Sequence, residues 1–243
     1  MSLSTIYLVD YYANSLDSPM HRASVTVKMI STIMALGCII LNTSLLSLVL
    51  QLFLIIGFQA ASRLPIRRLL LWAIYPTFFG ALFALSQAQY SIELSVQTLL
   101  RAVDAALLML LLINTTPYAK IIPLIRKFSK TISNLAFFSY RFFFLFIDES
   151  EKRLTAFRVR GGLLGPLGTK IRNIAKLIGL LFVSYIESGE EVYHAVKTRG
   201  YRGMFSTETV AGREMTRNDY VPILLALFSV VILVVGIVGR GLS

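Results

Sequence analysis

The sequence predicts an all-α integral membrane protein, with about five transmembrane helices and a long cytoplasmic pair of amphipathic helices between the fourth and the fifth. Two observations lead to this prediction. Hydrophobic residues make up 56% of the 243 residues and charged residues only 15%, against about 25% charged in an ordinary soluble domain. The apolar residues also gather in runs long enough to cross a bilayer. These features exclude a soluble globular enzyme, a disordered chain and a fibrous protein.

Five apolar runs are expected to cross the membrane as helices. Each holds 17 to 20 residues, and a spanning helix needs about 20 because each residue adds about 1.5 Å across a hydrocarbon core of about 30 Å. Asn42–Ser44 separates the first two runs, and Pro76 is expected to kink the third. In chain order the runs are Met29–Leu41 with an extension back to Val25, Leu45–Ala61, Leu69–Ala88, Leu94–Ile113 and Tyr220–Gly239.

Two further apolar stretches are too short to span. Leu135–Ile147 carries Arg141 in its middle, and Ile174–Ile186 carries Lys176. Each uncharged piece is about 10 residues long, which is half of what a span needs. We therefore expect both stretches to lie in or under the membrane surface.

The distribution of Lys and Arg predicts the orientation. The loops 42–44 and 87–93 contain none, whereas the stretch 117–219 holds seventeen beside nine acidic residues. By the positive-inside rule the N-terminus and the long stretch lie in the cytoplasm. The net charge of +11 then reflects this bias. The expected division is a four-span domain over residues 1–113, a cytoplasmic segment over 114–219 and a last helix over 220–243.

The cytoplasmic segment contains an internal repeat at an offset of 39 residues. In each copy a small Ala precedes an Arg by four residues, so both lie on one face of a helix, and a Gly follows that can end the helix in a left-handed cap. A glycine-rich turn at 161–168 separates the copies, so the two helices are expected to form a hairpin. The first copy consists of Asp148, Glu151, Ala156, Arg158, Arg160 and Gly161. In the same order, the second copy consists of Glu187, Glu190, Ala195, Lys197, Arg199 and Gly200.

The repeat allows two interpretations. A cation near a helix C-terminus is favoured by the helix dipole and a following Gly is a common stop signal, so one Arg-Gly pair needs no further function. Two pairs with matching acidic, Ala and basic positions favour docking instead. The small Ala lets another surface approach, and the Arg one turn later can make a forked contact with a carboxylate.

The two copies resemble the paired coupling motifs of the transmembrane (T) component of energy-coupling-factor (ECF) ABC transporters, the EcfT/CbiQ cobalt transport family. The resemblance extends along most of the chain in order. The family usually has Ala-Arg-Gly where this chain has Val159 and Thr198 before the Arg. The resembling segments are the family's opening at 18–28, its basic loop at 63–68, the end of its fourth span at 115–117, and the motifs at Glu151–Gly161 and Glu190–Tyr201.

This resemblance implies a coupling subunit of an importer. Such a subunit binds two cytoplasmic ABC-type ATPases and a separate small membrane subunit that captures cobalt, nickel or a vitamin. ATP hydrolysis would belong to the partners, and the chain itself would be neither an enzyme nor bound to a cofactor. The coupling residues it implies are Ala156, Arg160, Gly161, Ala195, Arg199 and Gly200, supported by Glu151, Arg158, Glu190 and Lys197.

Arg101 and Asp104 are the other candidates for function. They lie three residues apart inside the fourth apolar run, where ionisable side chains are functional suspects. We expect them to form an intramembrane ion pair that is either structural or orients the capture subunit. His21 and His194 are far apart, so neither a metal nor a catalytic site is expected.

Two other classes of function remain open. A stand-alone permease or channel would pass its solute between its own spans, and would need polar residues along several of them. A membrane scaffold would recruit lipid or RNA through its basic segment, but the nine interleaved acidic residues disfavour nucleic acid. Partners other than nucleic acid are therefore expected: the two ATPases, the capture subunit and the lipid bilayer.

Overall fold

The computed structural model describes residues 3–200 and 217–241. Every regular element among these residues is helical. The chain divides into two compact units, one of residues 1–121 with 211–243 and one of residues 122–210. We call them the membrane unit and the hairpin unit and describe each by itself.

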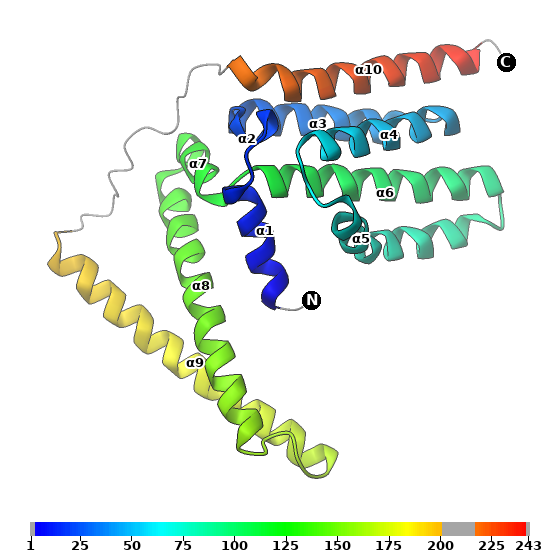
Figure 1. Cartoon of the computed structure of the whole chain (residues 1–243). Coiled ribbons are helices and arrows are strands. Elements are labelled where there is room, and N and C mark those ends of the chain that lie inside the picture. Colours follow the sequence, from blue (N-terminus) through cyan, green and yellow to red (C-terminus); the bar gives the residue numbers. More distant parts are fainter. Residues whose placement is uncertain (1–2, 201–216, 242–243) are drawn as a thin grey trace. The chain divides into compact units, whose positions relative to one another are not determined.

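The membrane unit holds five long apolar helices and several short ones. Its last long helix packs with the first two, although the sequence places it in a segment of its own. Figure 1 shows α3, α4, α6 and α10 running side by side. The helices are α1 (Leu3–Ser15), α2 (Pro19–Arg22), α3 (Val25–Leu41), α4 (Leu45–Ala61), α5 (Ile66–Gln87), α6 (Ile92–Thr115) and α10 (Tyr220–Gly241), with 3-10 turns η1 (Tyr118–Lys120) and η2 (Arg217–Asp219).

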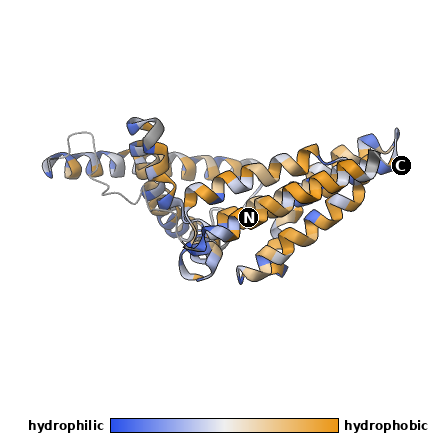
Figure 2. Ribbon diagram, turned by 90° about the horizontal axis from the view of Figure 1, so that it is seen from above, coloured by the Kyte–Doolittle hydropathy of each residue, from blue (hydrophilic) through white to orange (hydrophobic). Residues whose placement is uncertain are grey.

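The five predicted runs coincide with these long helices. Helices α5, α6 and α10 are long and apolar enough to cross a membrane, and α3 and α4 are shorter apolar helices of 17 residues. Seventeen residues cover about 26 Å, slightly less than the hydrocarbon core of about 30 Å. Figure 2 shows that apolar residues occupy most of the length of these helices. Helix α5 continues through Pro76. The prediction of an all-α membrane protein is confirmed.

The inner faces of these helices form one core. Fully buried side chains come from α4 (Leu48, Ile55), α6 (Leu107) and α10 (Leu225). Polar bonds also join the helices: Gln51 donates to the hydroxyl of Ser229 at 2.8 Å, which connects α4 to α10, and Gln59 donates to the carbonyl of Leu107 at 2.9 Å. Because lipid offers no hydrogen bonds, such buried bonds help to fix how the helices pack. The outer faces carry exposed apolar side chains, among them Ile33, Phe53, Phe83 and Val235.

A buried lysine binds the C-terminal end of α6. The Lys28 ammonium donates to the carbonyl of Thr115 at 2.8 Å and to that of His21 at 3.3 Å. Carbonyls in the last turn of a helix lack partners within the helix, so Lys28 satisfies one that would be unpaired. Lys28 is 1% exposed and His21 is 7% exposed. The end of α6 is thus held to the start of α3 and to α2.

His21 makes a second set of hydrogen bonds at the C-terminal end of α6. Its Nε2 lies 3.2 Å from the carbonyls of both Tyr12 and Asn114, and its Nδ1 lies 2.7 Å from the Ser18 hydroxyl. Carbonyls only accept, so Nε2 carries the proton. Burial lowers the pKa of His21, and the nearby positive charge of Lys28 lowers it further. A neutral imidazole therefore joins α1, α2 and the end of α6.

The hairpin unit consists of α7 (Ile122–Phe128), α8 (Lys130–Val159) and α9 (Leu167–Thr198). The stretches expected to be short surface helices lie inside α8 and α9, which have 30 and 32 residues. The charges that interrupt the apolar runs do not interrupt the helices, because Lys and Arg are good helix formers. The expected hairpin of two helices is present, but its arms are about 45 to 48 Å long at about 1.5 Å per residue.

Candidate functional site

The first Arg-Gly pair lies where α8 ends. Gly161 has φ +73°, its N–H donates to the carbonyl of Arg158 at 3.0 Å, and the N–H of Gly162 donates to that of Phe157 at 2.9 Å. This pair of bonds is a Schellman motif, in which a left-handed residue satisfies the last carbonyls of a helix. Arg160 is the C-cap residue immediately before it. Glycine is favoured here because a side chain at this φ is strained.

The second pair repeats this geometry where α9 ends. Gly200 has φ +78° and its N–H donates to the carbonyl of Lys197 at 3.1 Å. Arg199 is the C-cap residue, as Arg160 is in α8. Tyr201, the last residue of the second resembling segment, lies outside the described residues. The repeat in the sequence is therefore a repeat in backbone conformation.

The two pairs lie at opposite ends of the hairpin. Arg160 precedes the turn that begins α9, whereas Arg199 follows the last residue of α9. A helix of 32 residues is about 48 Å long, so the structure does not bring the two arginines together.

The side chains of Ala156, Arg160, Ala195 and Arg199 are all exposed. So are those of Glu151, Arg158, Glu190 and Lys197, and the Lys197 ammonium lies 5.7 Å from the centre of the Tyr193 ring.

A groove of about 390 Å³ lies beside the first pair. Ala156 and Arg160 line it from α8, and α9 contributes Asn173 and Lys176. Asn173 also donates to the carbonyl of Gly162 at 3.2 Å, which holds the turn against α9. The groove combines an apolar floor with the cations Arg160 and Lys176 and with Arg153, which is paired with Glu149. It therefore suits an acidic, partly apolar segment of another protein. Its remaining lining residues are Arg153, Phe157, Leu177 and Leu180.

Sequence reasoning did not single out Arg153, Asn173 or Lys176. The spacing of Arg153, Ala156 and Arg160 is i, i+3, i+7, which places them on one helix face and is a signal in the sequence. No comparable signal exists for Asn173 and Lys176, since they join the groove only through the way α9 crosses α8.

Polar bonds fix the crossing of the two helices. The Tyr185 hydroxyl donates to the carbonyl of Phe146 at 2.9 Å and lies 2.8 Å from the Ser150 hydroxyl. Arg153 donates to the Ser184 hydroxyl at 2.8 Å and to Glu149 at 2.7 Å. The Phe146 and Tyr185 rings are 4.3 Å apart.

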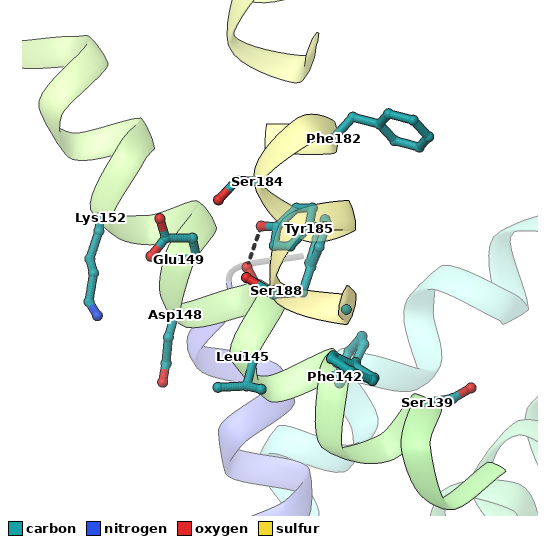
Figure 3. Close-up of a pocket in the computed structure, with 13 residues that line it drawn as sticks. Ser139, Phe142, Leu145, Asp148, Glu149, Lys152, Phe182, Ser184, Tyr185 and Ser188 are labelled. Atoms are coloured by element: carbon teal, nitrogen blue, oxygen red, sulfur yellow. Dashed lines mark hydrogen bonds between the residues drawn. The ribbon is translucent and has the colours of Figure 1, made fainter. Parts of the chain in front are cut away.

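Next to this crossing lies a larger cavity of about 790 Å³ (Figure 3). Its walls carry aromatic rings from both helices, with acidic and basic side chains on the α8 side. The lining residues are Ser139, Phe142, Phe143, Leu145, Phe146, Asp148, Glu149, Lys152, Phe182, Ser184, Tyr185, Ser188 and Gly189.

The expected ion pair between Arg101 and Asp104 is not formed. Arg101 instead donates from Nη2 (2.6 Å) and Nε (3.2 Å) to the carbonyl of Asn42, in the short loop between α3 and α4. Asp104 is fully buried, and neither of its carboxyl oxygens has a hydrogen-bond partner in the described part of the chain. The i, i+3 spacing predicts a contact, but the long Arg side chain reaches a loop carbonyl 59 residues away.

The comparison with protein families decides the class of the molecule. The family model CbiQ, cobalt transport protein, matches residues 17–210. The chain belongs to the CbiQ family. Its match covers both Arg-Gly pairs, the hairpin and all but the last of the apolar helices. A search of curated proteins gives no match. The CbiQ family is one of membrane transport components and not of enzymes, and the apolar helices of this chain agree with that membership.

Proposed function

We propose that this CbiQ chain is the coupling subunit of an ECF-type ABC importer. The observation that carries the proposal is the pair of exposed Arg-Gly helix ends, alike in backbone geometry and placed at opposite ends of one hairpin. One Arg-Gly helix end needs no partner, but two ends with a matching exposed Ala one turn before the Arg favour a docking role. Together with membership of a transport family, the repeat supports two docking tips for two copies of one kind of partner.

The partners we propose are two cytoplasmic ABC-type ATPases, one at each tip. Arg160 lies at the turn before α9 and Arg199 at the far end of that helix, which is too far apart for one side-chain pocket, so each arginine would meet its own ATPase. A guanidinium can bind a carboxylate in a fork, and the neighbouring Ala leaves space for the partner's surface. Arg160 and Lys176, which line the groove, favour an acidic segment.

The third partner is a small membrane subunit that captures the substrate. The family description supports cobalt, and nickel or a vitamin are the other candidates. The aromatic cavity at the crossing (Figure 3) offers an apolar surface that such a subunit could contact. The importer would lie in the plasma membrane of a prokaryote with the N-terminus of this chain in the cytoplasm, which the excess of Lys and Arg in residues 117–219 supports.

The test is retention of the ATPase by variants of the full chain. Arg160→Ala and Arg199→Ala should each weaken the complex by about 2 to 5 kcal/mol, because the partner's carboxylate stays buried without its cation. This cost corresponds to about 30-fold to several-thousand-fold in affinity. Substitution by Lys should rescue only partly, since an ammonium makes no forked contact.

The matched controls are Arg158→Ala and Lys197→Ala. Each removes the same charge two residues earlier, on a different face of the same helix. Both control variants should retain more ATPase, and should support more substrate import, than the Arg160 and Arg199 variants do. If the Arg160 and Arg199 double variant retains the ATPase as well as the unaltered chain does, these residues only end helices and the proposal is wrong.

A further inference from the structure

A small polar cavity lies at one end of the membrane unit and is not used by the proposed coupling. Its volume is about 360 Å³, and its walls are Asp17, Ser18, Pro19, Arg22, Arg63 and Asn218. These residues come from three places in the sequence. Arg22 precedes α3 by three residues, Arg63 follows the end of α4 by two, and Asn218 precedes α10 by two. The cavity therefore lies beside the ends of three apolar helices, α3, α4 and α10.

The cavity has many hydrogen-bond donors and few free acceptors. Arg22 donates from Nε to Asp17 at 2.6 Å and from Nη2 to the other carboxyl oxygen, so both oxygens of Asp17 are engaged. These bonds lower the pKa of Asp17. A guanidinium has five N–H donors, so Arg22 keeps three. Within the described residues the Arg63 guanidinium makes no hydrogen bond or salt bridge, so its donors are available, although its positive charge also helps to lower the pKa of the Asp17 carboxyl group. A ligand with several acceptor oxygens and a negative charge would satisfy this set.

The backbone of Arg63 points to a function for its side chain. Arg63 has φ +57°, and among the described residues it is the one non-glycine residue with positive φ. Its N–H donates to the carbonyl of Ala60 at 2.9 Å and the N–H of Leu64 donates to that of Gln59 at 3.2 Å. This is the Schellman motif seen at Gly161, with Arg in the position that glycine usually occupies. The left-handed conformation costs an L-residue about 1 kcal/mol or more, so an arginine here is explained by what its side chain binds.

We propose that this cavity binds the phosphate of an anionic phospholipid headgroup. Phosphate oxygens accept several hydrogen bonds at once and guanidinium groups match their geometry. A lipid is favoured over a soluble ligand because the cavity borders the ends of α3, α4 and α10, at the level where headgroups lie. The site does not depend on the hairpin or on the ATPases.

The variant that tests this site is Arg63→Gly. Glycine adopts positive φ without a Cβ penalty, so the backbone is kept while the guanidinium is removed. The matched control is Arg67→Gln, which removes the same charge four residues later from an exposed position outside the cavity. The full chain is purified in neutral detergent and melted with added phosphatidylglycerol, with phosphatidylcholine, or with inorganic phosphate at the same concentration.

Phosphatidylglycerol should raise the melting temperature of the unaltered chain and of Arg67→Gln, and should do so more than phosphatidylcholine does. In Arg63→Gly the same shift should need about tenfold more phosphatidylglycerol or more, the loss expected for one charged hydrogen-bonding group. Without lipid, Arg63→Gly should melt no lower than the unaltered chain.

Three results would overturn the assignment. An unchanged response of Arg63→Gly to phosphatidylglycerol would remove Arg63 from the site. An equal loss in Arg67→Gln would show a diffuse basic surface. Equal stabilisation by inorganic phosphate would make this a site for free phosphate and not for lipid. Because none of these measurements contains an ATPase, failure here is separate from failure of the coupling proposal.

Discussion

Asp104 is expected to destabilise the membrane unit, and its removal should stabilise it. The carboxyl group lies in α6, is fully buried, and has no hydrogen-bond partner among the described residues. A buried polar group without a partner costs about 1 to 3 kcal/mol. In Asp104→Ala this cost disappears, and the small cavity left behind offsets part of the gain at about 24 cal/mol per Å³. We expect a net increase of about 1 to 2 kcal/mol in the free energy of unfolding.

Arg101 provides the counterpart of this experiment. Its two bonds end on the carbonyl of Asn42, so Arg101→Gln should lower the free energy of unfolding by about 1.5 to 3 kcal/mol, the range for hydrogen bonds from charged groups. If the two residues are independent, the effects in the double variant add within about 0.5 kcal/mol. The assay is reversible unfolding in mixed micelles, followed by the fluorescence of Trp72, the single tryptophan.

The double variant distinguishes an ion pair between Arg101 and Asp104 from two independent residues. An ion pair would make the loss of either partner costly, because it leaves an unpaired charge in the membrane, and would make the double variant less damaging than the sum. A coupling energy above about 1.5 kcal/mol, or a clear loss of stability in Asp104→Ala, would refute the arrangement seen here and restore the pair that the sequence suggests.

Two further predictions concern pH and topology. The pKa of His21 is lowered in the fold from its ordinary value of 6.5, so the unfolded chain takes up the proton more readily. The contribution of His21 to stability should therefore be full above about pH 6.5 and should be lost as the pH drops below it. His21→Gln should abolish that part of the pH dependence of the melting temperature, and an equal acid sensitivity in this variant would contradict the assignment to His21. In a chain without Cys38, single cysteines at Ser150 or Thr169 should be protected from impermeant thiol reagents added outside the cell, and one at Thr43 should react. External labelling at Ser150 would reverse the orientation.

The apolar helices could be predicted from the sequence because lipid imposes a simple rule. A spanning helix must be continuous, apolar and bounded by polar residues, and Leu45–Ala61 meets all three conditions, so its predicted bounds are those of α4. The rule fails for α8 and α9. It measures apolar runs, whereas these helices continue through Arg141 and Lys176 with polar and apolar faces. Their helical nature was predictable, but their lengths were not.

The helix ends could be predicted and their surroundings could not. The offset of 39 residues identified both Arg-Gly pairs, because a left-handed cap depends on local sequence. The groove beside Arg160 depends on Asn173 and Lys176, which come close only through the crossing of two long helices. The prediction of the partner of Arg101 was wrong for the same reason, since Asn42 is 59 residues away in the sequence. Local geometry was thus readable, whereas long-range partners needed the fold.

The position of the crossing bears on how the hairpin could couple its two ends. Tyr185 and Ser150 meet at the crossing, so Arg160 follows it by ten residues along α8 and Arg199 by fourteen residues along α9. At about 1.5 Å per residue the two arms measure about 15 and 21 Å. Because the two tips lie on opposite sides of this bonded crossing, a change in the spacing of two bound ATPases would be transmitted through both arms to the crossing. The aromatic cavity borders this point (Figure 3), so a capture subunit seated there would sense that change directly. This is the physical reason to propose a coupling role for a hairpin that holds its two arginines apart.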